Sequence, residues 1–233
     1  MKKVSSSTLL GKNLTVRGLS SNKFWDFENG FSWFAHQTRL NKMLAHYELY
    51  KSIVGLPGHV LELGVFKGTS LLRLAGFRNY LENDYSRKIV GFDTFGKFPD
   101  KNIKLKKDLD FIDYFAKDSG DGLSLDELKS ILAKKDFKNI FLVKGNVFET
   151  LPSYLAKNPE TKIAYLHLDM DVKEPTAFAL EMLYDRVVPN GVIVLDDYNY
   201  IAGGTQAIDD FVKGKKLRIE KTSCHVPAFI RKP

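Results

Sequence analysis

Residues 163–198 predict a strand, a helix and a second strand in succession, and this unit limits the folds open to the chain. Residues 163–168 and 191–195 are apolar runs of the kind that buried strands contain. A helix is predicted over residues 174–186, which open with Glu-Pro, and residues 189–191 have the composition of a turn. A crossover of this kind joins parallel strands, so we expect an α/β fold with a parallel sheet.

Acidic residues follow both strands of this unit. Asp169 and Asp171 come after the first strand, and Asp196 and Asp197 come directly after the second. Because the carboxyl ends of adjacent parallel strands meet at one edge, we expect Asp169, Asp196 and Asp197 to lie close together. Two carboxylates about 4 Å apart repel each other by roughly 4 kcal/mol at an effective dielectric constant near 20. The cluster therefore requires a cation, a raised pKa or a wider separation.

The composition bounds the class of protein. The chain has 233 residues, of which 44% are hydrophobic and 27% charged, as in ordinary globular domains. No segment approaches the roughly 18 consecutive apolar residues of a membrane helix, and no apolar signal-peptide core follows the N-terminus. A single cysteine, Cys224, excludes an internal disulfide and favours the cytoplasm. We expect no catalysis by Cys224, because no partner motif accompanies it.

The charge is positive. Lys and Arg number 35 against 28 Asp and Glu, which gives a formal net charge of +7 and can favour anionic partners such as nucleotides, membranes and nucleic acids. The positive residues concentrate at Lys104–Lys107 and Lys213–Arg218, and neither segment has the interleaved aromatic residues of a base-stacking surface. We interpret both as solvated lysine clusters and expect neither a membrane nor a nucleic-acid partner.

The rest of the chain alternates predicted helices and strands, as a parallel α/β sheet requires. Apolar spacing predicts helices over residues 40–53, 71–81, 125–135, 148–157 and 205–213. Short apolar runs predict strands over residues 59–63, 88–92 and 139–143. Ser124 and Glu127 form a capping-box pattern at the start of one helix. Residues 216–222 and 225–231 predict a terminal antiparallel hairpin.

No linker-like stretch divides the chain, so we expect one principal domain over residues 39–233 and an N-terminal extension over residues 1–38. The extension carries six aromatic residues between Phe24 and Phe34. These either line a substrate pocket or, as we favour, pack onto the domain, since aromatic side chains bury large areas. Residues 94–137 form an insertion, and insertions of this length are commonly functional.

A glycine-containing turn is predicted after the strand at residues 59–63. Glu62, Gly64 and Gly68 lie where dinucleotide-binding proteins carry Gly-x-Gly-x-x-Gly, but Phe66 stands in place of the middle glycine. Gly64 still lets the backbone approach a ligand, and Gly68 lets the turn close. Asp93 follows the next strand, where a carboxylate accepts hydrogen bonds from ribose hydroxyls. Glu62 would orient the turn or reach a ligand ammonium group; the alternative for the whole motif is a plain strand–helix turn.

Five stretches of the chain together resemble the macrocin O-methyltransferase family, which belongs to the class I S-adenosylmethionine-dependent methyltransferases and methylates sugar hydroxyls. They span most of residues 58–212 and are Glu62–Gly68, Gly91–Pro99, Leu166–Asp171, Pro189–Tyr198 and Gly204–Phe211. The resemblance implies a doubly wound, Rossmann-like methyltransferase fold. Its sheet would be seven-stranded and mostly parallel, with an antiparallel hairpin at the C-terminus.

The resemblance also implies the binding residues. Those for S-adenosylmethionine would be Glu62, Gly64, Lys67, Gly68, Thr69, Ser70, Asp93 and Asn146. The glycine turn would hold the methionine end of the cofactor, Asp93 the ribose, and the region around Asn146 would flank the adenine. A divalent metal would be bound by Asp169, Asp196 and Asp197, and an all-carboxylate set favours Mg²⁺ over zinc.

The implied reaction is methyl transfer to a hydroxyl of a sugar, a sugar nucleotide or a glycosylated small molecule. A metal-bound hydroxyl has a lowered pKa, and a carboxylate would remove its proton, with Asp169 as the first choice and Asp171 as the second. Asp171 fits equally well as a cap of the following helix. His167 lies two residues before Asp169, so it faces the same side of the strand. It is either a further base or, as we favour, a buried, hydrogen-bonded histidine.

Two other functions compete with this reading. The positive charge suggests an RNA methyltransferase, whose RNA binding would depend steeply on salt. A nucleotide- or metal-binding module without catalysis is a different class. The acid cluster argues against both, because it repels an RNA backbone unless a metal is bound and is costly to keep without a use. The sequence leaves open the identity of the acceptor and whether the chain forms a homo-oligomer.

Overall fold

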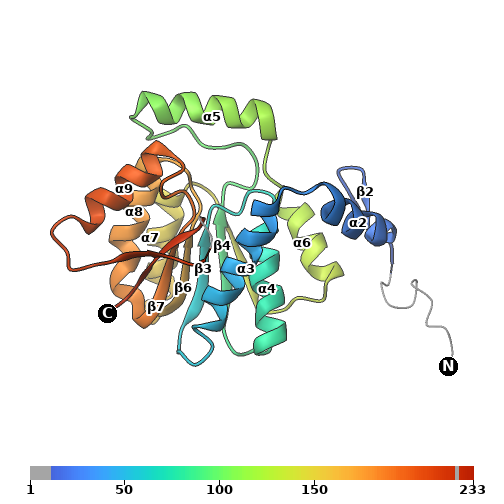
Figure 1. Cartoon of the computed structure of the whole chain (residues 1–233), viewed down its shortest axis with the longest axis horizontal. Helices are drawn as coiled ribbons and strands as arrows, with labels where there is room; N and C mark the ends of the chain where they lie inside the picture. Colours follow the sequence, from blue (N-terminus) through green and yellow to red (C-terminus); the bar gives the residue numbers. More distant parts are fainter. Residues whose placement is uncertain (1–11, 224–225) are drawn as a thin grey trace.

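The computed structural model describes residues 12–223 and 226–233, so the predictions for Cys224 and for the first residue of the second hairpin strand lie outside it. Its centre is a seven-stranded sheet of order β5-β4-β3-β6-β7-β9-β8 (Figure 1). The strands are β3 (His59–Leu63), β4 (Ile89–Asp93), β5 (Ile140–Lys144), β6 (Ile163–Leu168), β7 (Val187–Leu195), β8 (Ile219–Lys221) and β9 (Ala228–Arg231). The first four pairings in this order are parallel and the last two antiparallel, which confirms the predicted fold class and terminal hairpin.

Helices cover both faces of the sheet. One face packs against α3 (Gln37–Lys51), α4 (Thr69–Leu81) and α6 (Leu125–Lys134). The other face packs against α7 (Val147–Lys157), α8 (Lys173–Leu183) with the short η2 (Tyr184–Arg186), and α9 (Ala202–Val212). Every residue of β6 is buried, because a central parallel strand covered on both faces has no solvent side. This explains why the central strands are continuous apolar runs rather than alternating ones.

The strands β6 and β7 are parallel neighbours, as predicted. Leu168 pairs with Leu195 at their carboxyl ends, so the acids that follow them share one edge of the sheet. The predicted turn at residues 189–191 lies inside β7, which begins at Val187. There the pairing along β6 is irregular, and Asn190 takes a left-handed conformation with φ 64°. The turn residues therefore form a bulge within the strand.

The insertion contains α5 (Lys106–Ser119), a helix that the sequence analysis did not predict. It lies above the carboxyl edge of the sheet (Figure 1). Its buried residues are Asp108 and Ile112, although Leu109, Ile112, Phe115 and Ala116 have the apolar spacing of an amphipathic helix. Asp108 accepts a hydrogen bond from the backbone N–H of Lys173 at 2.8 Å, which fixes α5 to the start of α8. The capping box of α6, between Ser124 and Glu127, is confirmed.

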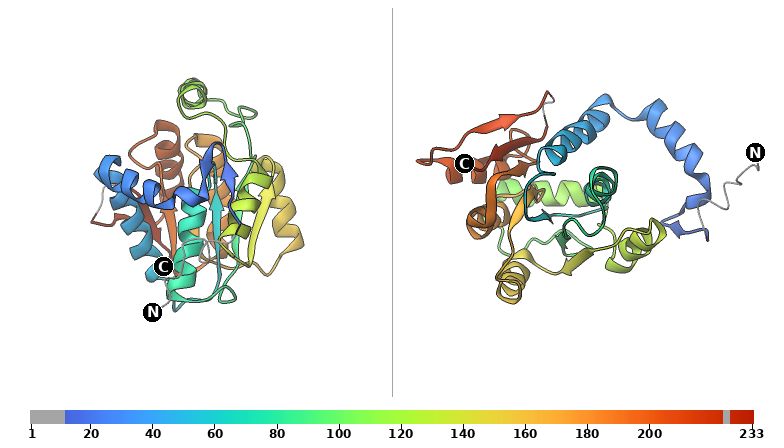
Figure 2. Two further views of the ribbon diagram at one scale, coloured as in Figure 1. Left: turned by 90° about the vertical axis from the view of Figure 1, so that its right-hand side faces the viewer. Right: turned by 90° about the horizontal axis from the view of Figure 1, so that it is seen from below.

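The N-terminal segment consists of β1 (Thr15–Val16), β2 (Leu19–Ser20), η1 (Ser21–Lys23) and the aromatic helix α2 (Phe24–Phe34). α2 buries none of its residues, and Figure 2 shows it standing apart from the sheet. The prediction that its aromatic residues pack onto the domain is therefore wrong for the single chain. Arg17 ties the segment to the insertion, since its guanidinium bonds to Glu127 at 3.0 Å and to the carbonyl of Gly122 at 2.7 Å.

Among the residues that the structure describes, no helix is both long enough and apolar enough to cross a membrane. The division of the chain at residue 38 stays a prediction. It is compatible with the packing of α3 against α4, which joins α3 to the sheet domain.

Candidate active site

A cavity of about 700 Å³ lies at the carboxyl ends of β3, β4, β6 and β7. This edge includes the point between β3 and β6 where the strand order reverses, which is where doubly wound sheets bind ligands. The predicted site residues on its wall are Gly64, Lys67, Thr69, Ser70, Asp93, Asn146, Asp169, Asp171, Asp196 and Asp197. Three predicted residues of the described chain, Glu62, Gly68 and His167, lie off this wall.

Asp93 ends β4 and holds the turn that follows β3. Its Oδ2 accepts hydrogen bonds from the backbone N–H groups of Val65 and Phe66 at 2.8 and 2.9 Å. Its Oδ1 accepts one from the backbone N–H of Phe95 at 2.6 Å. Hydrogen bonds to a charged group are stronger than neutral ones, so Asp93 fixes the shape of the turn. Its contact with ribose stays a prediction.

The two glycines of the turn have different roles. Gly64 has φ +92°, and a Cβ there would lie 1.7 Å from the carbonyl oxygen of Asp169. Only glycine allows this approach, which brings the turn against the end of β6. Gly68 has φ +74°, and a Cβ there would lie 2.9 Å from Leu128 of α6. Gly68 thus serves the close packing of the turn against α6 rather than the cavity surface.

Two helix starts face the cavity. Gly68 is the N-cap of α4 and supplies no side-chain cap, so the first-turn N–H groups beside Thr69 and Ser70 have no cap oxygen. Asn146 is the N-cap of α7, and its side chain accepts a hydrogen bond from the backbone N–H of Phe148 at 3.1 Å. Asn146 lies on the cavity wall, as a residue that flanks the adenine must. Its hydrogen bond to the helix start fixes the orientation of its side chain.

Aromatic rings from the insertion form another part of the wall. Phe115 of α5 contacts Phe66 of the glycine turn with ring centroids 5.1 Å apart, and it stacks on Phe111 at 5.7 Å. Phe98 contacts Phe115 at 6.1 Å. Lys67 lies over the ring of Phe66 and donates to the carbonyl of Ser119 at 2.6 Å. The unpredicted helix α5 therefore forms one side of the cavity.

The acids after β6 and β7 meet on the part of the cavity wall that these two strands form. Asp169, Asp171 and Asp197 each place a carboxylate oxygen within 4.8 Å of the others, and Asp197 accepts a hydrogen bond from the backbone N–H of Asp171 at 2.9 Å. Burial and then Asp196 raise the pKa of Asp169 to about 8. Burial is also the main cause that raises the pKa of Asp171 to about 6 and that of Asp197 well above its usual value. The cluster is thus short of positive charge.

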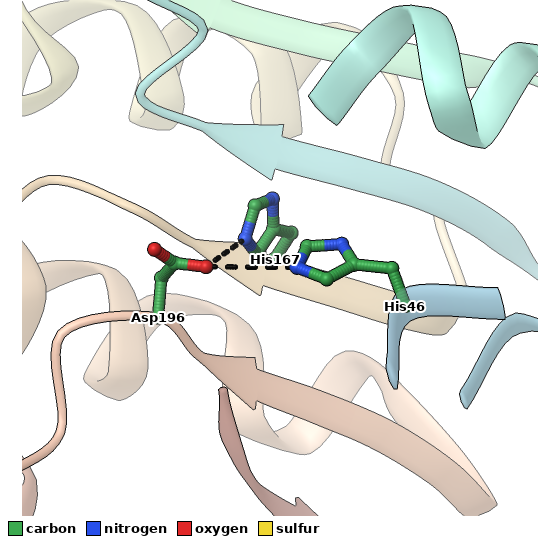
Figure 3. Close-up of side chains that lie close together, drawn as sticks. All are labelled: His46, His167 and Asp196. Carbon is green, nitrogen blue, oxygen red and sulfur yellow. Dashed lines mark hydrogen bonds and ion pairs between the residues drawn. The ribbon is translucent and has the colours of Figure 1, made fainter. Parts of the chain in front are cut away.

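Asp196 differs from these acids because cations surround it. Its Oδ2 is bonded to the ammonium group of Lys42 from α3, and its Oδ1 lies 3.2 Å from Nε2 of His167 and 3.6 Å from Nε2 of His46 (Figure 3). Burial alone would raise the pKa of Asp196, but Lys42 and then the two histidines hold it well below its usual value. Asp169 and Asp196 also raise the pKa of Lys42 to about 12, against its burial. Lys42 is therefore an internal cation of the acid cluster.

The two buried histidines carry different charges. Burial would lower the pKa of His167, but its hydrogen bonds to Asp196 and to Glu62, the latter at 3.1 Å, raise it to about 10. Burial dominates at His46 and lowers its pKa to about 4. His167 is thus an imidazolium between two carboxylates, and His46 is neutral. The structure shows the buried, hydrogen-bonded histidine that the sequence analysis favoured, and it places Glu62 on His167 instead of on the cavity wall.

Four cationic residues of the cavity wall were missed by the sequence analysis, namely Lys42, Lys101 and the two arginines Arg39 and Arg73. A weak signal existed for the first, because Lys42 and His46 are four residues apart on a predicted helix and so share one face. Nothing in the sequence connected that face to Asp196, which lies 154 residues away from Lys42 along the chain.

The strand order, the glycine turn after β3 and the acids at the ends of β4, β6 and β7 define a Rossmann-like methyltransferase fold. The family of macrocin-O-methyltransferases (TylF) matches residues 34–228 of the chain. The chain belongs to this family of S-adenosylmethionine-dependent O-methyltransferases, as its sequence motifs predicted.

One relative with a known activity is the 8-demethyl-8-(2,3-dimethoxy-alpha-L-rhamnosyl)-tetracenomycin-C 4'-O-methyltransferase of Streptomyces olivaceus. It is 29% identical over 155 residues, a match that covers 62% of this chain. The chain spans only about half of that relative, because the match covers 54% of the relative's length.

Three solved structures are similar over most of the chain. The calicheamicin methyltransferase CalS11 is 25% identical with a TM-score of 0.66, and the match covers 89% of this chain and 85% of the other. An apo structure of CalS11, described as a TDP-rhamnose 3'-O-methyltransferase, is 26% identical with a TM-score of 0.64 over the same shares of both chains. The O-methyltransferase NovP has a TM-score of 0.72, 20% identity and coverage of 82% and 78%, and this likeness supports the fold alone.

Proposed function

We propose that this protein transfers the methyl group of S-adenosylmethionine to a hydroxyl of a sugar, with the assistance of Mg²⁺. The observation that carries the proposal is the position of the acid cluster. It lines the same cavity as Asp93 and the glycine turn, and Gly64 of that turn lies against the backbone of Asp169. A donor held by the glycine turn would therefore present its methyl group to an acceptor held at the adjacent acid cluster.

The cavity wall suits the cofactor. Asp93 offers a carboxylate for ribose hydroxyls, Asn146 and Phe148 flank the space for the adenine, and Thr69 and Ser70 stand at an uncapped helix start for the methionine end. When bound, S-adenosylmethionine supplies an electrophilic methyl group that needs no further activation. The residues of the chain then have to orient the acceptor oxygen and accept its proton.

The acid cluster suits a divalent metal. Asp169, Asp171 and Asp197 all have raised pKa values because burial and neighbouring carboxylates disfavour their charges, and a cation reverses that penalty. The donors are carboxylate oxygens, the ligands that Mg²⁺ prefers. Asp169, Asp196 and Asp197 would hold the ion, which lowers the pKa of a bound hydroxyl. Asp196 would have to exchange its contact with Lys42 for the metal.

Asp169 is the first choice for the proton acceptor and Asp171 the second. Both carboxylates lie on the cavity wall beside the proposed metal position, and a general base has to lie within hydrogen-bond reach of the proton that it accepts. His167 lies behind Asp196 without access to the cavity, so a role as base would require relay through that carboxylate. We assign His167 to orienting Asp196.

The substrate class rests on the relatives. By their names, the tetracenomycin methyltransferase acts on a compound that carries a rhamnosyl group, and CalS11 acts on TDP-rhamnose. A sugar or sugar-nucleotide hydroxyl is therefore the acceptor class for this chain. Acceptor selection would fall above all to the insertion at residues 94–137, whose α5 forms one wall of the cavity.

The test is a methyl-transfer assay with S-adenosylmethionine and a panel of TDP-sugars and rhamnosides, with and without a chelator. We expect transfer that a chelator abolishes and that added Mg²⁺ restores. Asp196→Ala should remove it, whereas Asp185→Ala, at a carboxylate that is 96% exposed, should not. Full activity in the chelator would refute the metal role, and transfer to RNA but to no sugar would refute the acceptor class.

A further inference from the structure

His46, His167 and Asp196 form a buried cluster behind the cavity wall, and the proposed chemistry gives His46 no role. His46 comes from α3 and His167 from β6, and Asp196 directly follows β7. Both histidines are 0% exposed, and Asp196 is 6% exposed. Figure 3 shows that both rings turn one nitrogen toward the same oxygen of Asp196, although they come from distant parts of the chain.

The Nε2 atom of His46 is buried without a partner. Within residues 12–223 and 226–233 it has no hydrogen bond, since Oδ1 of Asp196 lies 3.6 Å away, beyond hydrogen-bond distance. The other ring nitrogen, Nδ1, contacts the hydroxyl of Tyr165 at 3.5 Å. With its proton on Nδ1, the ring directs a free lone pair into the cluster. A buried polar atom without a partner requires an explanation, and a bound cation supplies one.

The spacing of the three side chains fits one ion. A tetrahedral ion with bonds of about 2.1 Å, the length that zinc makes to nitrogen and carboxylate oxygen, separates its ligand atoms by roughly 3.4 Å. Oδ1 of Asp196 lies 3.2 Å from Nε2 of His167 and 3.6 Å from Nε2 of His46. The three residues offer ligand atoms that are all within 4.8 Å of one another. They therefore surround one position at close to the spacing that such an ion requires.

His167 also has the second partner that a metal-binding histidine needs. Its Nδ1 is hydrogen-bonded to Oε1 of Glu62 at 3.1 Å, and Glu62 is fully buried. Metal-binding histidines donate their other N–H group to a carboxylate or a carbonyl, which orients the ring and makes the coordinating nitrogen more basic. The register of β3 and β6 pairs Glu62 with His167, so the sheet itself holds this arrangement.

We propose that His46, His167 and Asp196 form a site for a divalent ion that prefers nitrogen ligands, such as Zn²⁺. Imidazole nitrogens suit zinc and the later transition metals, whereas the carboxylates of the neighbouring acid cluster suit Mg²⁺. The two sites would share Asp196, whose Oδ1 faces the histidines while its Oδ2 is bonded to Lys42. The ion takes the place of the proton on Nε2 of His167, and that proton leaves to water.

The cavity gives an ion access to this site. Asp169 and Asp196 both line the cavity, and the two histidines lie behind them. The side chain of Asp169 is 26% exposed, and its Oδ2 lies 4.0 Å from Nε2 of His167. Asp169 is thus placed to supply a fourth ligand from the cavity side. The site would bind its ion whether or not the protein transfers methyl groups, so the two proposals can fail separately.

The experiment adds Zn²⁺ to the metal-free protein without a histidine tag. Competition with a chromophoric chelator measures the affinity and the number of ions bound by the wild type, His46→Gln and His167→Gln. His36→Gln is the matched control, because it removes an exposed histidine that is not on the cavity wall. Asp171→Asn removes a carboxylate of the acid cluster that is not part of the nitrogen site. Circular dichroism melting confirms that each variant is folded.

Pulsed electron paramagnetic resonance of the protein loaded with Cu²⁺ gives a readout that needs no folded variant. Imidazole nitrogens bound to Cu²⁺ modulate the electron spin echo, whereas the acid cluster of Asp169, Asp171 and Asp197 offers oxygen ligands alone. We expect the modulation of two imidazole rings in the wild type and in His36→Gln. A wild type without nitrogen modulation would refute the site.

We expect one Zn²⁺ per chain, bound at least about tenfold more weakly by each buried-histidine variant, since even changes to the partners of metal ligands have effects of this size. His36→Gln and Asp171→Asn should bind Zn²⁺ like the wild type. If folded His46→Gln and His167→Gln do so as well, the site is refuted. Loss in Asp171→Asn alone would place the ion in the acid cluster and refute it too. Zinc binding as expected, with no methyl transfer to any sugar, would instead refute the proposed function.

Discussion

At the end of β4, the carboxylate of Asp93 accepts hydrogen bonds from three backbone N–H groups. At the ends of β6 and β7, by contrast, the carboxylates of Asp169, Asp171, Asp196 and Asp197 lie near one another, and a single lysine, Lys42, contacts them. The first carboxylate has partners supplied by its own fold. Among the others, Asp169, Asp171 and Asp197 have raised pKa values, and only Asp196 has a lysine, Lys42, as its direct partner among the described residues.

The difference separates two ways of building a binding site. Asp93 is part of the structure of the glycine turn, so its loss should damage fold and binding together. The acid cluster is unfavourable for the protein alone, so neutralising one of its members should stabilise the protein while it damages function. Sites of the second kind mark places where a ligand completes the charge balance. The predictions below test this contrast from the largest expected effect to the smallest.

Asp93→Ala should have the largest effect. It leaves the N–H groups of Val65, Phe66 and Phe95 without their acceptor, and we expect the free energy of unfolding to fall by about 3 kcal/mol. Binding of S-adenosylhomocysteine should weaken by about a hundredfold or more, since about 2.7 kcal/mol is a factor of one hundred. Urea unfolding and calorimetry measure the two effects. Asp100→Ala, at an exposed position of the insertion, is the control. A variant with normal stability would show that the turn holds its shape without Asp93.

Lys42→Met should strengthen metal binding, whereas Asp93→Ala should weaken cofactor binding. It removes the cation that occupies Asp196, so we expect the affinity for Mn²⁺ to rise by about tenfold, which corresponds to about 1.4 kcal/mol. The metal-free protein should become less stable, because a buried carboxylate loses its partner. Electron paramagnetic resonance of free Mn²⁺ measures the affinity, and Lys101→Met serves as the control. An unchanged affinity would mean that Lys42 and the metal do not compete.

The stability of the metal-free protein should fall as the pH rises from about 6.5 to 9. The pKa of Asp169 is raised to about 8, so its charge becomes a growing cost up to that pH. The pKa of His167 is raised to about 10, so the stability that its charge contributes is present below pH 6.5 and is lost as the pH rises towards 10. Both act in the same direction. His46, with a pKa lowered to about 4, opposes folding only below pH 6.5.

Thermal unfolding at several pH values measures this dependence. Mg²⁺ should reduce it, because the ion stabilises the charged acids. A melting temperature that stays constant between pH 6.5 and 9 in the absence of metal would contradict the assignment of the acid cluster as short of positive charge.

Asp171→Asn should have the smallest effect, a gain of about 1 kcal/mol in the free energy of unfolding above pH 7. The pKa of Asp171 is raised to about 6, so its charge is a cost above that pH and none below pH 4. Asparagine keeps the shape and tolerates the left-handed φ of 63° at this position. Urea unfolding at pH 5 and pH 8 measures the gain, with Asp185→Asn as the exposed control. A loss of stability at pH 8 would show that Asp171 is held by favourable contacts instead.

The sheet could be predicted from the sequence because its central strands are buried on both faces. β3 was predicted with its observed bounds and β4 within one residue, since each is a short apolar run between turn residues. The meeting of Asp169 and Asp197 followed from the rule that parallel strands end at one edge. α5 was missed although Leu109, Ile112, Phe115 and Ala116 have helical spacing, because residues 94–137 were interpreted as an insertion with a single helix at its end.

The partners of the acids could not be predicted. Lys42 reaches Asp196 only because α3 packs beside β6 and β7, a contact between distant parts of the chain that no local pattern encodes. The same holds for Glu62, an acid in an apolar strand, whose purpose becomes visible only when β3 and β6 pair Glu62 with His167. The aromatic residues of α2 were wrongly predicted to pack on the domain, since composition gives their tendency to be buried but not a surface to receive them.

The exposure of α2 has a practical consequence for spectroscopy. The chain has two tryptophans, and both lie on this helix, with Trp25 62% and Trp33 68% exposed. The intrinsic tryptophan emission of the protein therefore reports on α2 alone, and unfolding of the sheet domain should leave it almost unchanged. For the same reason, a shift of that emission when a ligand is added would mean that α2 itself has moved into a less polar environment.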